Sequence, residues 1–204
     1  MRWIYGRYNM EICNRSQGEE KRLMEKRITL LIGSARKNGN TEILADAFCK
    51  GVQEAGNTVH KITLFNRNIK GCLDCKYCYK HEGTCVLKDD MQEVYAVLKE
   101  TDLLVIASPV YFYNFSAQLK AVFDRMHNPI REEFPIKEVV LLSVCADQGM
   151  EVFHPLIETY KAINQYLGWE DKGSICVDGV EDKGKIIGHE KLKLAEELGR
   201  RVAK

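Results

Sequence analysis

The sequence predicts a single α/β domain, a five-stranded parallel sheet with helices on both faces. Short apolar runs typical of buried strands alternate with segments of helical periodicity. Parallel neighbours need crossover connections, so this alternation indicates a parallel sheet enclosed by helices. No repeat or low-complexity linker divides the 204 residues, a length that fits one domain.

The first predicted unit is a strand, a helix and a second strand. Residues 28–32 read Ile-Thr-Leu-Leu-Ile and end at Gly33, as expected of a strand buried on both faces. Residues 41–55 predict a helix because their apolar side chains recur at helical spacing, and Gly56 suits its end. A second strand is expected over residues 58–65.

The rest of the chain continues this alternation after a cysteine-rich loop. We expect strands at 102–107, 138–144 and 175–177, and helices at 90–100, 116–126, 151–167 and 189–202. Five strands fit the flavodoxin-like doubly wound order 2-1-3-4-5 better than the six-stranded dinucleotide-binding fold.

Residues 1–23 stand apart from this pattern. They mix charges without periodicity, and Met24 falls just ahead of the first strand. We expect an N-terminal extension, flexible or a start-site artefact, with the domain itself at 24–204. The alternative is an arm that packs against a partner.

Composition excludes several classes of partner. The 30 basic and 29 acidic residues leave a net charge of +1, which offers no field for nucleic acid or a membrane surface. No apolar stretch approaches the roughly 20 residues that cross a bilayer, and the longest apolar run near the N-terminus is too short for a signal peptide, so we expect none. We therefore expect a reducing cytoplasm, where clustered cysteines indicate metal or redox chemistry rather than a disulfide scaffold.

The most informative motif is a cysteine cluster within the loop at 72–85. Cys72, Cys75, Cys78 and Cys85 follow the pattern C-x2-C-x2-C-x6-C. Four thiolates this close can converge on one metal centre, a [4Fe–4S] cluster or a structural zinc. The short spacing favours the cluster, because zinc sites usually separate two C-x2-C pairs more widely. A metal-free redox loop and a pair of disulfides are the alternatives.

The loop after the first strand has the composition of a phosphate cradle. It supplies hydroxyl, amide and guanidinium groups ahead of a helix whose free N–H groups attract an anion. The candidate ligands are Ser34, Arg36, Asn38, Asn40 and Thr41. The loop lacks the G-x-G-x-x-G and Walker patterns, so it favours a single phosphate over a dinucleotide or ATP. An ordinary polar turn is the alternative.

The loop after the third strand is rich in aromatic residues. A planar heterocycle would stack on these rings, and the amides of residues 111–114 would bond its polar edge. The candidate residues are Pro109, Val110, Tyr111, Phe112, Tyr113 and Asn114. For Phe112 and Phe115, packing in the core or at a subunit interface is an equally good interpretation.

The loop after the fourth strand offers small residues that permit close approach to a flat ligand. Its candidates are Cys145, Ala146 and Asp147. Cys145 is interpreted as a buried apolar residue rather than a nucleophile, because no histidine partner lies nearby in the sequence. The three loops share one sheet edge, and together they fit FMN better than other common cofactors.

Two motifs resemble a known family. Residues 33–41, Gly-Ser-Ala-Arg-Lys-Asn-Gly-Asn-Thr, resemble the phosphate motif of NAD(P)H-dependent FMN reductases. Ser108-Pro109-Val110-Tyr111, with residues 118–125 downstream, is similar to that family's isoalloxazine-binding segment. The cysteine block running into Asp89-Asp90-Met91 resembles the iron–sulfur flavoproteins, whose cysteines hold a [4Fe–4S] cluster. The resemblance implies a homodimer or homotetramer.

The function expected from these features is that of an FMN-dependent oxidoreductase. Electrons would pass between NAD(P)H, or a cysteine-bound [4Fe–4S] cluster, and an unidentified acceptor. The flavin carries the chemistry, so no protein acid or base is assigned a catalytic role. The alternatives are an electron carrier fed by ferredoxin and a zinc-stabilised binding module without catalysis.

Overall fold

The computed structural model describes residues 26–204, and its centre is a five-stranded sheet. All four strand pairs are parallel, in the order β2-β1-β3-β4-β5, which confirms the predicted flavodoxin-like architecture. The strands are β1 (Ile28–Ile32), β2 (Val59–Thr63), β3 (Leu103–Pro109), β4 (Glu138–Val144) and β5 (Glu170–Val177). The predicted N-terminal extension, residues 1–23, and the expected start at Met24 lie outside the described residues.

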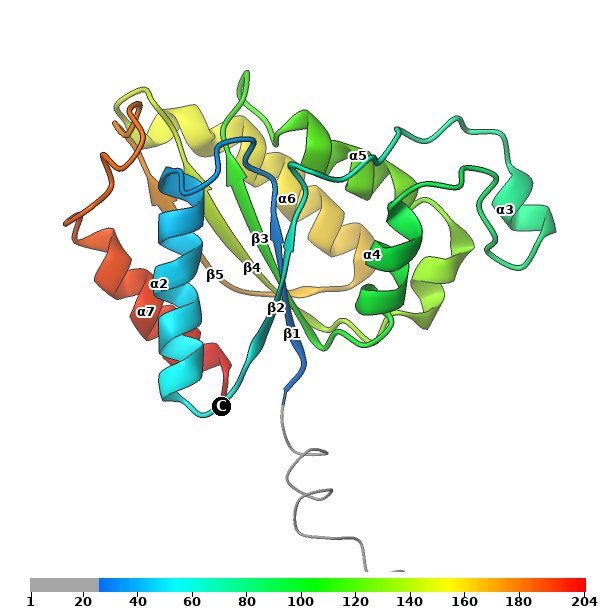
Figure 1. Ribbon diagram of the computed structural model, residues 1–204, viewed down its shortest axis with the longest axis horizontal. Coiled ribbons are helices and arrows are strands. Elements are labelled where there is room, and N and C mark those ends of the chain that lie inside the picture. Colours follow the sequence, from blue (N-terminus) through cyan, green and yellow to red (C-terminus); the bar gives the residue numbers. More distant parts are fainter. Residues whose placement is uncertain (1–25) are drawn as a thin grey trace, which may run out of the picture.

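Helices cover both faces of the sheet (Figure 1). One face carries α2 (Asn40–Glu54) and α7 (Lys191–Val202). The other carries α4 (Met91–Leu98), α5 (Ala117–Arg125) and α6 (His154–Leu167). Alternate residues of the central strands enter the two cores, with Leu30 and Val105 on one side and Leu31 and Ile106 on the other. A strand buried on both faces explains the near-continuous apolar runs of the sequence.

Glycines let α2 and α7 approach to backbone contact. A Cβ atom at Gly51 would lie 1.8 Å from the carbonyl oxygen of Glu196, and one at Gly199 would lie 2.1 Å from that of Phe48. Neither position has room for a methyl group. The two helices therefore form one rigid layer behind the loop that precedes α2.

Most element bounds agree with the predictions, and the differences have physical reasons. β5 begins at residue 170 rather than 175, because an edge strand tolerates the polar segment Glu-Asp-Lys-Gly-Ser. The helix predicted from residue 151 begins with a 3₁₀ turn, η2 (Met150–Phe153), and α6 follows with proline in its first turn. Two short elements were not predicted, α3 (Tyr77–Lys80) and η1 (Pro129–Glu133).

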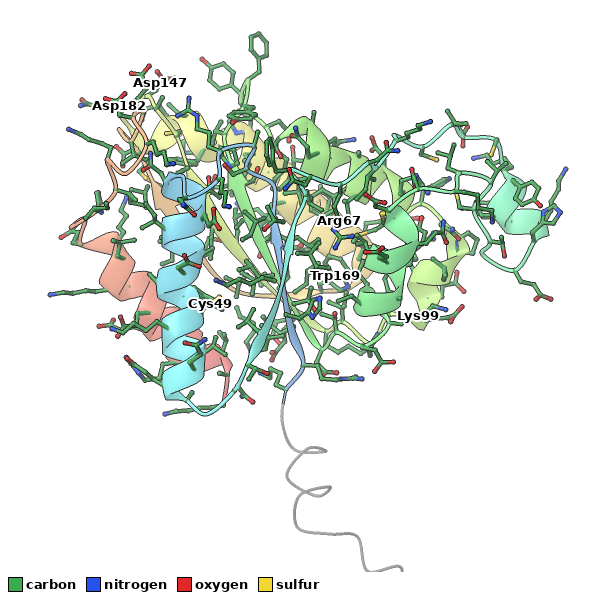
Figure 2. All side chains as sticks on the ribbon, viewed as in Figure 1. Cys49, Arg67, Lys99, Asp147, Trp169 and Asp182 are labelled. Atoms are coloured by element: carbon green, nitrogen blue, oxygen red, sulfur yellow. The ribbon has the colours of Figure 1, made fainter. Side chains whose placement is uncertain are left out.

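The topology places the loops after β1, β3, β4 and β5 at one end of the sheet. Figure 2 shows Asp147 and Asp182, from the loops after β4 and β5, at this end of the molecule. The cysteine loop leaves from β2 and extends beyond α4 and α5 (Figure 1). Within residues 26–204, no helix is both long and apolar enough to cross a membrane.

Candidate functional site

A hollow of about 220 Å³ lies at the C-terminal edge of the sheet. Its walls come from the three loops that the sequence singled out and from the loop after β5. The lining residues are Ser34, Arg36, Asn40, Thr41, Pro109, Val110, Tyr111, Val144, Cys145, Ala146, Val180 and Glu181. Chain segments more than 100 residues apart thus meet around one space, at the position where doubly wound sheets bind ligands.

The loop before α2 and the first turn of this helix present two buried hydroxyls to the hollow. Ser34 and Thr41 are 5% and 2% exposed, and the Ser34 hydroxyl accepts a hydrogen bond from the Arg36 amide at 3.1 Å. Gly39 occupies the N-cap of α2 and has no side chain to bond the first N–H groups of the helix. An anion would find these donors and the positive end of the helix dipole together.

The other predicted phosphate ligands have different positions. The Arg36 guanidinium lines the hollow and donates to the carbonyl oxygen of Glu181 at 2.8 Å. Asn38 is exposed, has a φ of +53° and does not line the hollow; its amide donates to the Glu42 carboxylate at 2.5 Å. Asn38 therefore shapes the turn.

Asn40 links this loop to the loop after β5 through hydrogen bonds of its side chain. Its side-chain amide donates to the carbonyl oxygens of Val180 and Asp182, each at 2.8 Å. Its side-chain oxygen accepts from the amides of Gly184 at 2.9 Å and Ile186 at 3.4 Å. The side chain spans about 140 residues of sequence and fixes the two walls to each other.

The aromatic loop forms a tight turn over residues 111–114. The amides of Tyr111 and Asn114 bond each other's carbonyl oxygens at 2.9 and 3.1 Å, which engages two of the N–H groups expected to reach a ligand. Tyr111 lines the hollow, whereas Phe112 and Tyr113 stand in solvent at positive φ, with Phe112 100% exposed. Phe115 turns into the core.

The loop after β4 confirms the structural interpretation of Cys145. The thiol is 4% exposed and donates to the carbonyl oxygen of Asp147 at 3.1 Å. Burial raises the pKa of Cys145, which disfavours the thiolate that a nucleophile needs. Ala146 lines the hollow and Asp147 does not. Cys49 and Cys176 are also buried.

Sequence reasoning missed Val180 and Glu181, the wall that the loop after β5 provides. Two features could have predicted this wall. The strand order 2-1-3-4-5 brings the end of β5 to the same edge as β4, and the following loop carries glycines at positive φ, Gly179, Gly184 and Gly188. These residues let the chain turn back over the hollow.

The four motif cysteines line a second, smaller cavity of about 30 Å³. Cys72 and Cys75 are exposed, Cys78 and Cys85 are half-buried, and all four are free thiols. The short helix α3 lies within this loop, and an ion pair between Lys76 and Asp74 precedes it. Among residues 26–204, no three histidine, cysteine or acidic side chains converge at metal-binding geometry. The donors share a cavity in an open arrangement.

Comparison with known proteins decides the family. The family model for NADPH-dependent FMN reductase matches residues 26–165. The chain belongs to this family. The matched segment contains the first three loops of the hollow and the whole cysteine loop.

Relatives of this FMN reductase family member include named iron–sulfur flavoproteins. One from Methanocaldococcus jannaschii is 31% identical over 84% of this chain and 92% of its own length. One from Archaeoglobus fulgidus is 33% identical over 85% of this chain and 77% of its own length. The solved NAD(P)H:quinone oxidoreductase from Methanothermobacter marburgensis superposes with a TM-score of 0.69, at 17% identity over 87% of this chain and 99% of that chain. That likeness shows the shared fold.

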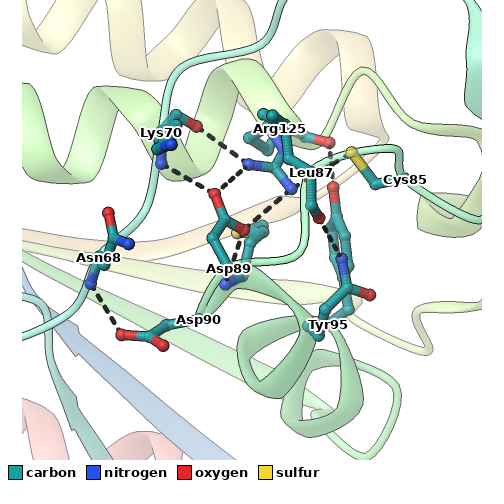
Figure 3. Close-up of polar contacts among 10 residues, drawn as sticks. Asn68, Lys70, Cys85, Leu87, Asp89, Asp90, Tyr95 and Arg125 are labelled. Atoms are coloured by element: carbon teal, nitrogen blue, oxygen red, sulfur yellow. Dashed lines mark hydrogen bonds and ion pairs between the residues drawn. The ribbon is translucent and has the colours of Figure 1, made fainter.

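A buried ion pair between Arg125 and Asp89 lies beside the cysteine loop (Figure 3). Arg125, the last residue of α5, donates to Asp89 at 2.8 and 3.2 Å and to the sulfur of Cys85 at 3.3 Å. Burial acts to raise the pKa of Asp89, but the hydrogen bonds from Arg125 and the Lys70 amide outweigh it and hold that pKa below its ordinary value. The sequence analysis placed Arg125 in the segment 118–125 and Asp89 at the end of the cysteine block, but it did not predict their pairing. Arg125 lies three residues after Val122, on the buried face of α5, which was the available signal.

Proposed function

We propose that this chain is an FMN-dependent oxidoreductase that binds FMN in the hollow at the sheet edge. The observation that carries the proposal is the meeting of buried hydroxyls and a helix N-terminus with an apolar wall in one space. A phosphate needs the first feature and a planar ring system needs the second. The hollow offers donors for a single phosphate, which supports FMN rather than FAD.

The residues of the hollow divide the work of binding between them. Ser34, Thr41 and the Arg36 guanidinium would hold the phosphate. Tyr111 and the strand-end residues Cys145 and Ala146 would contact the ring. Bound FMN supplies the exchange of a hydride or electrons, so the protein's part is to orient the ring and to exclude water from one side.

The electron donor is proposed to be NAD(P)H, and the acceptor is a separate molecule. The family's description and the putative NAD(P)H-dependent FMN-containing oxidoreductase of Bacillus subtilis, 26% identical over 86% of this chain and 97% of its own length, support this donor. Ferredoxin is the second candidate, and the cysteine loop favours it because a cluster exchanges single electrons.

The four cysteines are proposed to ligate a [4Fe–4S] cluster. Their thiols line one cavity, and four thiolates are the donor set that such clusters use. The half-buried Cys78 and Cys85 would face the protein side, with the exposed Cys72 and Cys75 toward solvent. The relatives named as iron–sulfur flavoproteins support the assignment. Iron and sulfide would draw the open arrangement of donors together.

The assembly is proposed to be a homodimer or homotetramer in the cytoplasm. Phe112 and Tyr113 place two aromatic rings side by side in solvent, with ring centroids 6.4 Å apart, and a partner subunit would cover them. The free thiols of the described cysteines fit a reducing compartment.

An anaerobic visible spectrum of the purified protein tests the proposal. The expected result is a yellow protein with structured flavin bands that releases FMN on denaturation. Additional broad brown absorbance would indicate the cluster. A colourless protein that contains zinc would contradict the oxidoreductase and identify a zinc-stabilised binding module. Bleaching of the flavin bands on addition of NADPH or NADH identifies the nicotinamide donor. Bleaching of the flavin bands only with reduced ferredoxin would identify the protein as an electron carrier fed by ferredoxin.

A further inference from the structure

Burial of the Arg125 side chain carries a large desolvation penalty. The side chain is 1% exposed, and a buried guanidinium is costly unless every donor is engaged. Its partners are the Asp89 carboxylate, the carbonyl oxygen of Lys70 at 3.0 Å and the sulfur of Cys85 at 3.3 Å. Among the described residues its Nε atom has no partner. The guanidinium therefore bonds a sulfur of the cysteine loop as well as its carboxylate counter-ion.

Asp89 clamps the guanidinium in a fixed orientation. Both carboxylate oxygens accept from Arg125, and they also accept from the amides of Lys70 at 3.0 Å and Met91 at 3.3 Å. With its own side chain 3% exposed, Asp89 has no freedom to swing away. The clamp leaves Nη2 directed at Cys85, and Arg125 lines the cavity that the four cysteines share (Figure 3).

We propose that Arg125 is a positioning residue for the cysteine centre, which it orients and tunes through Cys85. The inference rests on the cluster proposed above. A hydrogen bond and a nearby positive charge stabilise electron density on a ligating sulfur, and this favours the reduced form of a cluster. Arg125 thus raises the reduction potential for the uptake of a single electron, and Asp89 holds it in place.

The alternative is a staple that only joins α5 to the segment before α4. A staple would contribute stability through Asp89 and Lys70 and would leave the electronic properties of the cysteine centre unchanged. The bond to the Cys85 sulfur distinguishes the two, because a staple does not require it.

The test compares potentials of anaerobically reconstituted protein, measured by optical redox titration with a chemical reductant. The double variant Arg125→Gln with Asp89→Asn removes both charges, so no uncompensated buried charge remains. The matched control is Arg27→Gln with Asp102→Asn, which neutralises an exposed Arg–Asp pair at the N-terminal end of the strands, whereas the cysteine loop follows the C-terminal end of β2. Arg125→Lys retains a cation without the planar fork. Iron content and urea unfolding are measured for every variant.

We expect the double variant to hold the parent's iron and to show a lower potential, with Arg125→Lys in between and the control at the parent value. An unchanged potential in the iron-loaded double variant would overturn the inference and leave the cluster intact. If the double variant loses iron, the positioning role is supported only if the single variant Arg125→Lys retains it. Loss of iron from both variants, with normal folding of the control, identifies a staple. A parent without iron would contradict the proposed cluster itself, and the inference with it.

Discussion

The Asn40 side chain and the carbonyl oxygen of Val180 form a hydrogen bond of 2.8 Å that closes the hollow at the sheet edge. Asn40 begins α2, and Val180 follows β5, so the bond joins the first helix of the described chain to the segment after its last strand. The site is therefore assembled by long-range contacts, and its shape depends on a side chain that the sequence presents as a simple phosphate ligand.

Asn40→Ala should cost about 2–4 kcal/mol of unfolding free energy, because it removes four hydrogen bonds to backbone groups, two of them buried and two partly buried. Urea unfolding measures the loss. Asn38→Gly is the control, since it keeps the positive φ and removes an exposed side chain from the same loop. Equal stability of the two variants would mean that Asn40 does not hold the walls together.

Gly199→Ala should destabilise the fold by at least about 1–3 kcal/mol, because the new methyl group would meet the carbonyl oxygen of Phe48 at 2.1 Å. Thermal unfolding provides the measurement. Gly71→Ala is the matched control, as a Cβ there has no neighbour within 4 Å. If Gly199→Ala melts with the parent, α2 and α7 are not in backbone contact.

Asp89→Asn should lower the unfolding free energy by about 3 kcal/mol near pH 7, because it leaves Arg125 as an uncompensated buried charge. The folded pKa of Asp89 is lowered, so its contribution is complete above the ordinary carboxyl pKa of about 3.9 and is lost as pH falls through the lower folded value. The gap between parent and variant should therefore shrink below about pH 4.

The control for this pH series is Asp90→Asn, whose carboxylate accepts only an exposed amide bond from Asn68 in the described structure. Its effect should stay below about 1 kcal/mol at every pH. A gap between parent and Asp89→Asn that persists unchanged at pH 3 would show that Asp89 does not titrate as the ion pair requires.

The fold was predictable because its central strands are buried on both faces. β1 and β4 have the bounds expected from their apolar runs, and every predicted helix is present. The edge strand β5 was shortened in the prediction because residues 170–174 are polar, and only its pairing with β4 reveals them as strand. Periodicity reports burial, so it does not detect the polar first half of this strand.

The site was predictable only in part, for a related reason. Loop composition identified Ser34, Thr41 and Tyr111, which line the hollow. It did not separate Tyr111 from Phe112, because a tight turn places one ring in the hollow and the other in solvent. Contacts such as Asn40 with Val180 and Arg125 with Cys85 depend on tertiary packing, which local composition does not encode.

Cys78→Ser should abolish the binding of iron after anaerobic reconstitution, whereas the parent should hold about four irons per chain. A half-buried ligand contributes one corner of the centre and closes it toward the protein. Iron and sulfide analysis gives the result, with Cys49→Ala as a control that removes a thiol far from the loop. Iron below one per chain in the parent would make this a cluster-free flavin reductase.

FMN titration of the apoprotein tests the central claim most directly, with flavin fluorescence as the readout. Arg36→Ala combined with Thr41→Ala should weaken FMN binding at least about 30-fold, since each charge-assisted or hydroxyl bond to phosphate contributes about 1–3 kcal/mol. Lys37→Ala, an exposed cation outside the hollow, should change the affinity by less than about threefold. A double variant that binds FMN as tightly as the parent would contradict the placement of the cofactor at this edge of the sheet.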